Sequence, residues 1–409
     1  MKRRKKRFEK NILKIFFLLI LLSILGFGIY KGKNLFNNSD KQTTNNNVTK
    51  NDKKEKNQDE VYKLKLLATG DGLIHSVIYR SYAKSDGSYD FTDAVKNVAD
   101  IVKDYDIAYY NQETPMGDSS IAYSGYPMFY VPSAFGDAMR NIGFNTVSLA
   151  SNHSLDKGEK GILNTVKYFK NTNVLYNGMS DSMEMRNNFI IKEKNNITYT
   201  MLSYTTITNG LNVPSGKEYL LNIYNKEQVK KDIEAVRDKV DVLIVAMHWG
   251  IEYQDSPNEE QKEIAEYLSS LGVDIIIGNH PHILQPITKV GNTIVMYSLG
   301  NFISNQYGNG DYNKLIGFMA TLDITKTVKA NKETTITYDN LGGELIFTKY
   351  TGNPITTAVH SNHTVIPFSK MTDNTYLQDY QRLYDKYCGV LKSMGTDLNI
   401  APIGSKAWE

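Results

Sequence analysis

Residues 273–282 have the sequence VDIIIGNHPH, in which an apolar run leads into His280 and His282. β-Branched residues bounded by glycine predict a buried strand, and open α/β sheets place their sites just beyond the carboxyl ends of strands. Two imidazoles at positions i and i+2 of one loop can face a common centre, and neutral imidazole is the commonest metal ligand in proteins. This stretch therefore predicts an α/β fold with a metal site at the strand end.

The same arrangement recurs upstream in the chain. The apolar run Val242–Met247 ends at His248, and the run Thr146–Ala150 leads to Asn152 and His153. Of the seven histidines, five follow predicted strands: His75, His153, His248, His280 and His282. A single histidine in such a position is more often structural, but five at equivalent positions indicate a metal site.

Charge is distributed unevenly along the 409 residues, although the formal net charge is only +3. Residues 1–14 carry eight Lys or Arg and one acid, Glu9, so the rest of the chain is mildly acidic. Binding to a nucleic-acid backbone needs clustered Lys and Arg. The acidic body therefore argues against a nucleic-acid partner.

An apolar segment follows these basic residues. Ile15–Tyr30 has no charge and, with the residues just before it, approaches the roughly 20 residues that cross a bilayer. Because it lacks the Ala-x-Ala pattern of a cleaved signal peptide, we favour an uncleaved anchor. We expect a cytoplasmic segment at 1–11, a transmembrane anchor at 12–30, and a single-pass protein of the cell membrane whose main domain is extracytoplasmic. The single cysteine, Cys388, fits such a domain if it does without disulfides.

Beyond the anchor the composition changes twice. Residues 31–60 are rich in Asn, Thr, Lys and Asp, so they predict a disordered linker. Residues 61–350 alternate predicted strands with helices of about 10–15 residues, which is typical of α/β layered domains. Residues 351–409 are expected to form a C-terminal extension that packs on the core, with a helix over Tyr376–Leu391.

Within the predicted domain, strands are expected at 64–68, 107–110, 146–150, 242–247, 273–277 and 293–297, and helices at 91–102, 134–142, 157–169, 228–240 and 259–271. Phe189–Ser203 and Phe318–Tyr350 alternate Thr, Ile and Tyr around Asn or Gly turns. These two regions predict antiparallel hairpins, so a purely parallel sheet is not expected. His360 and His363 lie in a polar stretch and are expected to be solvated.

Other strand ends also carry side chains that can bind cations. Asp71 follows the first strand, although Gly-Asp is also a common turn. Glu113 follows the second strand and could bridge two metals or be a solvated loop acid. Asn152 offers a carbonyl oxygen, and the adjacent His153 could serve as a general acid. Mixed Asp, Glu, Asn and His ligands suit Mn, Zn or Fe, whereas a Ca site would be all oxygen, and the candidates suffice for two ions.

Other chemistries fit the sequence less well. The chain has no Gly-x-Ser-x-Gly elbow, no phosphate-binding Gly-x-x-x-x-Gly-Lys-Ser/Thr loop and no His-Glu-x-x-His helix. A two-metal site, in contrast, can clamp a phosphoryl or similar oxyanion and activate a water molecule.

Six motifs follow one another in a fixed order. They are Gly70–His75, Asn111–Glu113, Ala150–His153 with Asp156 and Gly158 behind it, His248–Tyr253, Gly278–Pro286 and Tyr297–Phe302. With these motifs the sequence resembles the CapA-type capsule-synthesis family, which is named for poly-γ-glutamate biosynthesis. The resemblance covers roughly Leu64–Ile324.

The CapA-type family is similar in turn to calcineurin-like metallophosphoesterases, which implies a mixed β-sandwich flanked by helices. By that likeness one metal ion would be held by Asp71, His75 and His282. Glu113 would bridge to a second ion, which would be held by Asn152, His248 and His280. His153 would match the catalytic histidine. Supporting or substrate-contacting roles are expected for Asn111, Glu252, Asn279 and Asn301, which lie in the same motifs.

The sequence departs from the phosphoesterase pattern at two positions. One residue separates the Asp and the His of the first phosphoesterase motif, whereas three residues separate Asp71 from His75. The bridging acid of the wider superfamily is Asp, whereas Glu113 stands here. Both departures weaken the case for phosphate-ester hydrolysis more than the case for metal binding.

The resemblance implies a membrane-anchored, extracytoplasmic metal-binding protein that acts in synthesis, transport or anchoring of an anionic capsule polymer of the poly-γ-glutamate type. Two alternatives stay open: a surface metallophosphoesterase that hydrolyses a phosphate ester, and a non-catalytic assembly factor. Whether the site turns over as a dinuclear-metal hydrolase is also open. Expected partners are an anionic polymer or a phosphate-containing substrate, the membrane, and membrane-embedded capsule-synthesis subunits.

Overall fold

The computed structural model describes residues 58–306, 312–352 and 359–405. The predicted cytoplasmic segment, the predicted anchor at 12–30 and nearly all of the predicted linker lie outside these residues and stay predictions, as do the domain boundaries. In the part of the chain that is described, no helix is both long enough and apolar enough to cross a membrane.

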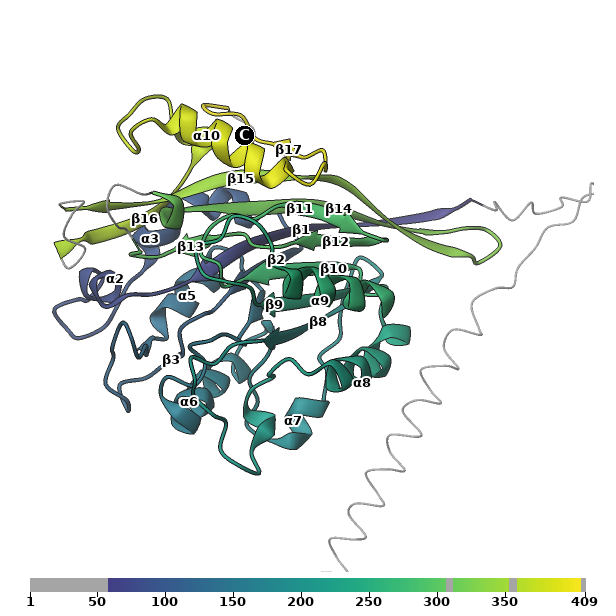
Figure 1. The fold of residues 1–409 in the computed structure, drawn as a ribbon, viewed down its shortest axis with the longest axis horizontal. Helices are drawn as coiled ribbons and strands as arrows, with labels where there is room; N and C mark the ends of the chain where they lie inside the picture. The colour runs from purple at the N-terminus through teal and green to yellow at the C-terminus, as the bar shows by residue number, and fades with distance from the viewer. Residues whose placement is uncertain (1–57, 307–311, 353–358, 406–409) are drawn as a thin grey trace, which may run out of the picture. The chain divides into compact units, whose positions relative to one another are not determined.

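Two mixed β-sheets carry the fold (Figure 1). The first sheet has the order β16-β15-β14-β1-β2-β5-β6, with β13 paired to β1 and β17 paired to β15. Its parallel half consists of β1 (Glu60–Gly72), β2 (Ile107–Asn111), β5 (Thr146–Ser148) and β6 (Leu175–Asn177). Its antiparallel half consists of β14 (Ile316–Val328), β15 (Thr334–Thr351) and β16 (Ser361–Pro367). The two short additions are β13 (Asn301–Ile303) and β17 (Asn399–Ile400).

The second sheet has the order β11-β12-β10-β9-β8-β7. Its four central strands run parallel: β8 (Ile197–Thr205), β9 (Val242–His248), β10 (Ile275–Asn279) and β12 (Thr293–Met296). Antiparallel strands form its edges: β7 (Lys192–Lys194) and β11 (Ile287–Val290). A separate pair is formed by β3 (Met116–Gly117) and β4 (Val131–Pro132).

The alternation of side chains along β9 shows why the central strands are apolar on both faces. Ile244 and Ala246 join the core between the two sheets, whereas Leu243, Val245 and Met247 pack beneath the helices of the outer layer. A strand buried on both faces has no polar side, which explains the uninterrupted apolar runs in the sequence.

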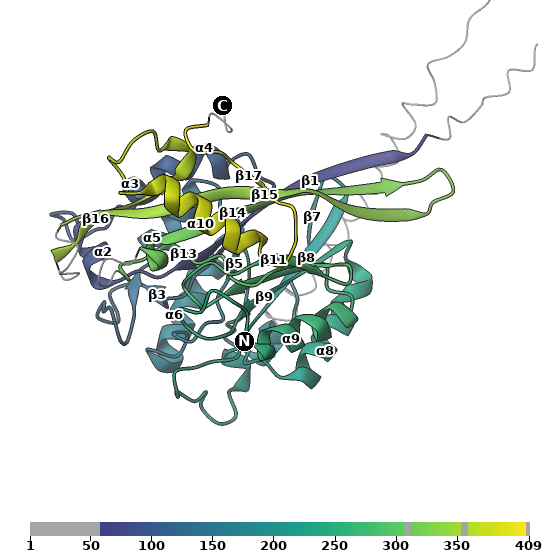
Figure 2. The ribbon, with the colours of Figure 1, turned by 45° about the horizontal axis from the view of Figure 1, so that its top comes forward.

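Helices cover the outer faces of both sheets (Figure 2). The first sheet is covered by α2 (Ser76–Ser81), α3 (Thr92–Val95), α4 (Ala99–Val102), α5 (Ala134–Asn141) and α6 (Gly158–Lys170). The second sheet is covered by α8 (Lys226–Val236) and α9 (Glu259–Ser270). The short helix α7 (Met183–Asn187) lies between these groups in the sequence. The predicted mixed sandwich with flanking helices is thus confirmed for the described residues.

The helix starts follow local chemistry. Asn258 and Gln261 form a capping box at α9, in which each side chain bonds the backbone N–H of the other residue. Asn225 accepts from the Gln228 N–H at the start of α8. The single helix expected over residues 91–102 is instead split into α3, a 3₁₀ turn (Lys96–Val98) and α4.

The C-terminal helix α10 (Tyr380–Lys392) packs through Leu383, Tyr387 and Leu391 into the core cluster that also holds residues of β11, β14 and β15. The two regions predicted as antiparallel hairpins are confirmed as β7–β8 and β14–β15.

The expectation that His360 and His363 are solvated is wrong, because both are buried. β16 carries His363 against β15 and the helices α2 and α3, a tertiary contact that a polar local sequence does not reveal.

Candidate functional site

The register of the first sheet brings three site residues into one row. Asp71 at the end of β1 stands opposite Asn111 on β2 and opposite Asn301 on β13. In the second sheet, His248 at the end of β9 stands opposite Asn279 on β10. Because the carboxyl ends of parallel strands meet at one edge of each sheet, the motif residues gather at that edge.

A first group of ligand atoms combines two carboxylates with an imidazole. Asp71, Glu113 and His282 each offer one ligand atom, and these atoms lie within 4.8 Å of one another. His282 Nδ1 lies 3.2 Å from Asp71 Oδ2 and 3.1 Å from Asn301 Oδ1, and His282 Nε2 lies 3.6 Å from Glu113 Oε1. Asn111 donates to Asp71 Oδ1 at 2.8 Å. All of these side chains are buried.

A second group combines an amide with two imidazoles. Asn152 Oδ1 lies 2.9 Å from His248 Nε2, and the rings of His248 and His280 have centroids 4.9 Å apart. The His280 and His282 centroids are 5.9 Å apart, so the two groups adjoin each other. The structure therefore brings together six of the seven predicted metal ligands.

The loop that carries His280 and His282 has an unusual backbone. His280 has a φ of 96° and His282 a φ of 60°, in the left-handed region that non-glycine residues seldom adopt. A Cβ on Gly278 would lie 2.0 Å from the Tyr297 carbonyl oxygen, so only glycine fits there. Such backbone outliers persist where the surrounding structure holds them, and they cluster at functional sites.

The two groups differ in how they bind protons. Burial lowers the pKa of His280 to about 3 and lowers the pKa of His248 well below its usual value. Burial also lowers the pKa of His282, but the Glu113 and Asp71 carboxylates outweigh it and raise that pKa to about 9. Burial raises the pKa of Glu113 well above its usual value. The group formed by Asp71, Glu113 and His282 therefore retains a proton that a bound cation would displace.

Several buried atoms of the site have no hydrogen-bond partner among the described residues. They include both carboxylate oxygens of Glu113 and Nδ1 of His280. Buried polar atoms are nearly always paired, and an unpaired one points to an ion or water that binds there. Carboxylate, amide and imidazole donors of this kind suit a divalent transition-metal ion, so the residues fit the predicted metal ions.

His153 lies beside both groups and is held by an acid. Its Nδ1 lies 2.8 Å from Asp156 Oδ2, which also accepts from the backbone N–H of Phe129 at 2.6 Å. The Phe129 ring packs edge-on against His153, with centroids 4.6 Å apart. With Nδ1 donating to Asp156, Nε2 is left to exchange a proton in the cavity.

His75 is placed differently from the other predicted ligands. Its Nδ1 lies 3.2 Å from both the Leu73 carbonyl oxygen and the Asn305 backbone nitrogen. It lines the same cavity but belongs to neither group of ligand atoms. The three residues between Asp71 and His75, where the phosphoesterase motif has one, agree with this displacement.

The remaining predicted residues support the ligands or reach the cavity. Asn301 holds His282 through Oδ1 and donates to the Lys314 carbonyl oxygen at 2.7 Å. Asn279 donates to the Tyr109 hydroxyl at 2.8 Å. A Glu252 oxygen lies within 4.8 Å of ligand atoms of His280 and His282.

The site opens into a cavity of about 340 Å³. Beside the predicted residues, loops add to its wall Tyr126, Phe129, Asn209, Leu211 and Tyr253. Sequence reasoning gave Phe129, Asn209 and Leu211 no role, because loops without periodicity carry no signal of where they fold. Asp156 also lines the cavity, and for this residue the sequence does carry a signal. Its spacing of three residues from His153 places an acid within reach of that histidine.

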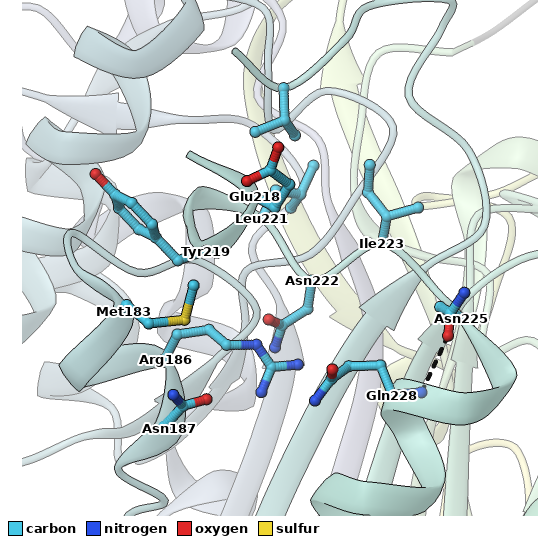
Figure 3. Close-up of a pocket in the computed structure, with 11 residues that line it drawn as sticks. Met183, Arg186, Asn187, Glu218, Tyr219, Leu221, Asn222, Ile223, Asn225 and Gln228 are labelled. Atoms are coloured by element: carbon cyan, nitrogen blue, oxygen red, sulfur yellow. Dashed lines mark hydrogen bonds between the residues drawn. The ribbon is translucent and has the colours of Figure 1, made fainter. Parts of the chain in front are cut away.

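A second cavity, of about 280 Å³, lies between α7, the start of α8 and the loop before α8 (Figure 3). Arg186 on its wall forms two bonds to Asp232, of 2.9 and 2.6 Å. Tyr204 and Gln228 also donate to Asp232. Arg186 is thus already paired with an acid of the protein, and we assign this cavity no chemistry.

Comparison with known families identifies the chain. The family described as "Bacterial capsule synthesis protein PGA_cap" matches residues 65–306, which is more than half of the sequence. The chain belongs to this family. The matched PGA_cap region holds every predicted site residue.

Two curated PGA_cap relatives are similar in sequence. The capsule biosynthesis protein CapA of Bacillus anthracis is 31% identical over 173 residues, and the PGA biosynthesis protein CapA of Bacillus subtilis is 31% identical over 176 residues. Each match covers 41% of this chain, and it covers 42% and 44% of the two relatives, less than half of their lengths. Among solved structures, a Staphylococcus aureus protein designated a 5'-nucleotidase, in complex with alpha-ketoglutarate, has a TM-score of 0.43 at 15% identity and covers 80% of this chain and 58% of that one. A similarity of that size carries no argument about this protein.

Proposed function

We propose that the protein is a membrane-anchored, extracytoplasmic metal-binding protein that acts in synthesis, transport or anchoring of an anionic capsule polymer of the poly-γ-glutamate type. Membership of the capsule-synthesis family supports the process. The observation that carries the metal site is the convergence of Asp71, Glu113 and His282, with both Glu113 oxygens buried and without hydrogen-bond partners among the described residues. The apolar segment at 12–30 would supply the anchor.

Asp71, Glu113 and His282 would hold one divalent ion, and Asn152, His248 and His280 a second, with Glu113 between them. Such ions, of Mn, Zn or Fe, would bind an anionic group and activate water for hydrolysis or transfer. Asn301 and Asn111 orient the ligands through the bonds described above. His153, oriented by Asp156, would give a proton to the leaving group from Nε2.

We propose that the capsule reaction also involves partners beyond this chain. Membrane-embedded synthesis subunits would deliver the polymer, which would meet the site outside the cytoplasm. The mildly acidic sequence after residue 14 supports no nucleic-acid partner.

The first test is the metal content of the full-length protein, purified in detergent and measured by elemental analysis. We expect about two equivalents of metal per chain after incubation with Mn²⁺, in line with the two ligand groups. A protein that binds no metal after this incubation would refute the site and leave the non-catalytic assembly role.

A surface metallophosphoesterase is the second candidate, because two adjoining groups of mixed ligands also suit phosphate-ester hydrolysis. An assay of the Mn²⁺-loaded protein for hydrolysis of a generic phosphodiester distinguishes the phosphoesterase function from the capsule-polymer function. Turnover that is lost in His153→Ala favours the phosphoesterase, whereas bound metal without turnover favours polymer handling.

A further inference from the structure

Apart from its histidines, the charged side chains on the wall of the metal cavity are all carboxylates among the described residues. Among the described residues that line it, the carboxylates are Asp156 and Glu252, and none is Lys or Arg. Asp71 and Glu113 add two further carboxylates beneath the wall. Two divalent ions would offset these four charges and leave none to spare. A run of polymer carboxylates inside the cavity would therefore stay uncompensated in a poorly solvated site, which is costly.

Glu252 is the acid of this wall that is best placed to meet a substrate. Its loop is fixed to the histidine loop, because Trp249 N–H donates to Asn279 O at 3.1 Å and Tyr253 N–H donates to Pro281 O at 2.8 Å. In the described part of the chain, no Lys or Arg forms an ion pair with Glu252. A carboxylate on a loop that is fixed on both sides thus stands beside the ligand groups without a Lys or Arg partner among the described residues.

The size of the cavity limits what can enter. Ligand pockets range from about 300 to 1,000 Å³, and this one, of about 340 Å³, lies at the lower end. It suits one small unit or a chain end more than the middle of a long polymer. Lys314 stands outside the lining, with Nζ 4.5 Å from the Tyr253 ring centroid, where a carboxylate further along the chain could meet it.

We propose that the cavity selects a group that carries an ammonium beside a carboxylate, as the amino end of an acidic peptide-like chain does. Glu252 accepts the ammonium, and the carboxylate of the same group faces the ion that Asp71, Glu113 and His282 would hold. This inference rests on the proposed metal site, and it narrows the substrate to a zwitterionic terminus. The ammonium supplies the positive charge that the cavity wall lacks, so the occupied site stays close to neutral.

The test is calorimetric binding of two probes to the full-length, Mn²⁺-loaded protein. L-Glutamate carries the ammonium, and glutarate is the same dicarboxylate without it. We expect L-glutamate to bind at least tenfold more tightly than glutarate. Glu252→Gln should weaken L-glutamate binding to the level of glutarate and leave glutarate binding and metal content unchanged. Asp255→Asn, an exposed acid on the same loop, is the matched control and should change neither affinity.

Three results would overturn the inference. One is equal binding of L-glutamate and glutarate, or no binding of L-glutamate, by the metal-loaded wild type. Another is an equal loss of both affinities in Glu252→Gln. The third is loss of metal in Glu252→Gln, which would make Glu252 a ligand. If the wild type retains metal in these cases, the proposed metal site stands, whereas a wild type without metal refutes both proposals.

Discussion

The metal cavity and the cavity beside α7 and α8 are similar in volume but opposite in how their polar groups are paired. Behind the wall of the second cavity, Asp232 receives hydrogen bonds from Arg186, Tyr204 and Gln228. In the metal cavity, both oxygens of Glu113 and Nδ1 of His280 are buried without such partners among the described residues. A buried ion pair with all of its hydrogen bonds is compatible with a stable folded state. Buried ligand atoms without partners lower the stability of the folded protein until an ion or water binds them.

This difference in pairing indicates that the metal cavity, and not the second one, is suited to bind an ion. A cavity whose arginine is already paired with Asp232 does not need a bound ion. A group of carboxylates and imidazoles that repel or lack partners needs a cation, and the fold holds them together through the surrounding sheet ends. The two cavities should therefore respond in opposite ways to substitution.

The largest effect is expected in the metal cavity. His280→Ala with His282→Ala removes one ligand from each group, so the protein should lose essentially all of its bound metal while staying folded. Elemental analysis of the purified variant measures its bound metal, and circular dichroism measures whether it is folded. His153→Ala, in the same cavity but outside the ligand groups, should retain its metal. Full metal content in the double variant would contradict the assignment of both groups.

Substitution in the second cavity should act on stability alone. Arg186→Met leaves Asp232 buried without its cation, which should lower the free energy of unfolding by about 3–5 kcal/mol and leave metal content unchanged. Urea unfolding compares the variant with wild type. Asp232→Leu added to Arg186→Met should recover part of the loss, and a metal deficit in the folded single variant would break the comparison.

Glu113→Gln should separate stability from function within the metal cavity. Burial raises the pKa of Glu113, so folding costs free energy at neutral pH, where the unfolded chain has this carboxyl ionised. The metal-free variant should therefore be about 1–3 kcal/mol more stable than metal-free wild type at pH 7, and the gain should shrink toward pH 4.5. Its metal content should fall. A variant that is less stable without metal would show that Glu113 is structural.

Near neutral pH the smallest effect is expected from His363, a buried histidine that lines neither cavity. Burial lowers its pKa to about 3, so below about pH 6.5 the unfolded chain binds a proton that the folded protein does not. This residue should make stability fall by up to about 1.4 kcal/mol per pH unit between pH 6.5 and 3. His363→Gln should show a shallower loss than wild type in urea unfolding over that range. Parallel pH profiles would mean that His363 does not contribute.

Much of the fold was predictable because the central strands are buried on both faces. Uninterrupted apolar runs such as Val242–Met247, bounded by turn residues and followed by amphipathic helices, leave few alternatives to a layered α/β domain. The hairpins were visible as alternation around Asn and Gly turns. The short elements β6, α7, β13 and β17 had too few residues to show a period.

The site was predictable to the extent that it follows strand ends. Asp71, Glu113 and His282 stand at the ends of buried strands or within three residues of them, and the sheet brings such positions to one edge. His75 lies no further past the end of β1 than His282 lies past the end of β10, but its loop turns it to backbone partners at Leu73 and Asn305.

The sequence by itself determined the layered fold, the capsule-synthesis family and the residue types that gather at the sheet edge, because periodicity and strand-end motifs are local properties. Only the tertiary structure decided which of those residues lack partners, that Asp156 holds His153, that His360 and His363 are buried, and that the cavity wall has no lysine or arginine among its described residues. These facts depend on contacts between segments far apart in the chain, and burial and pairing are properties of such contacts.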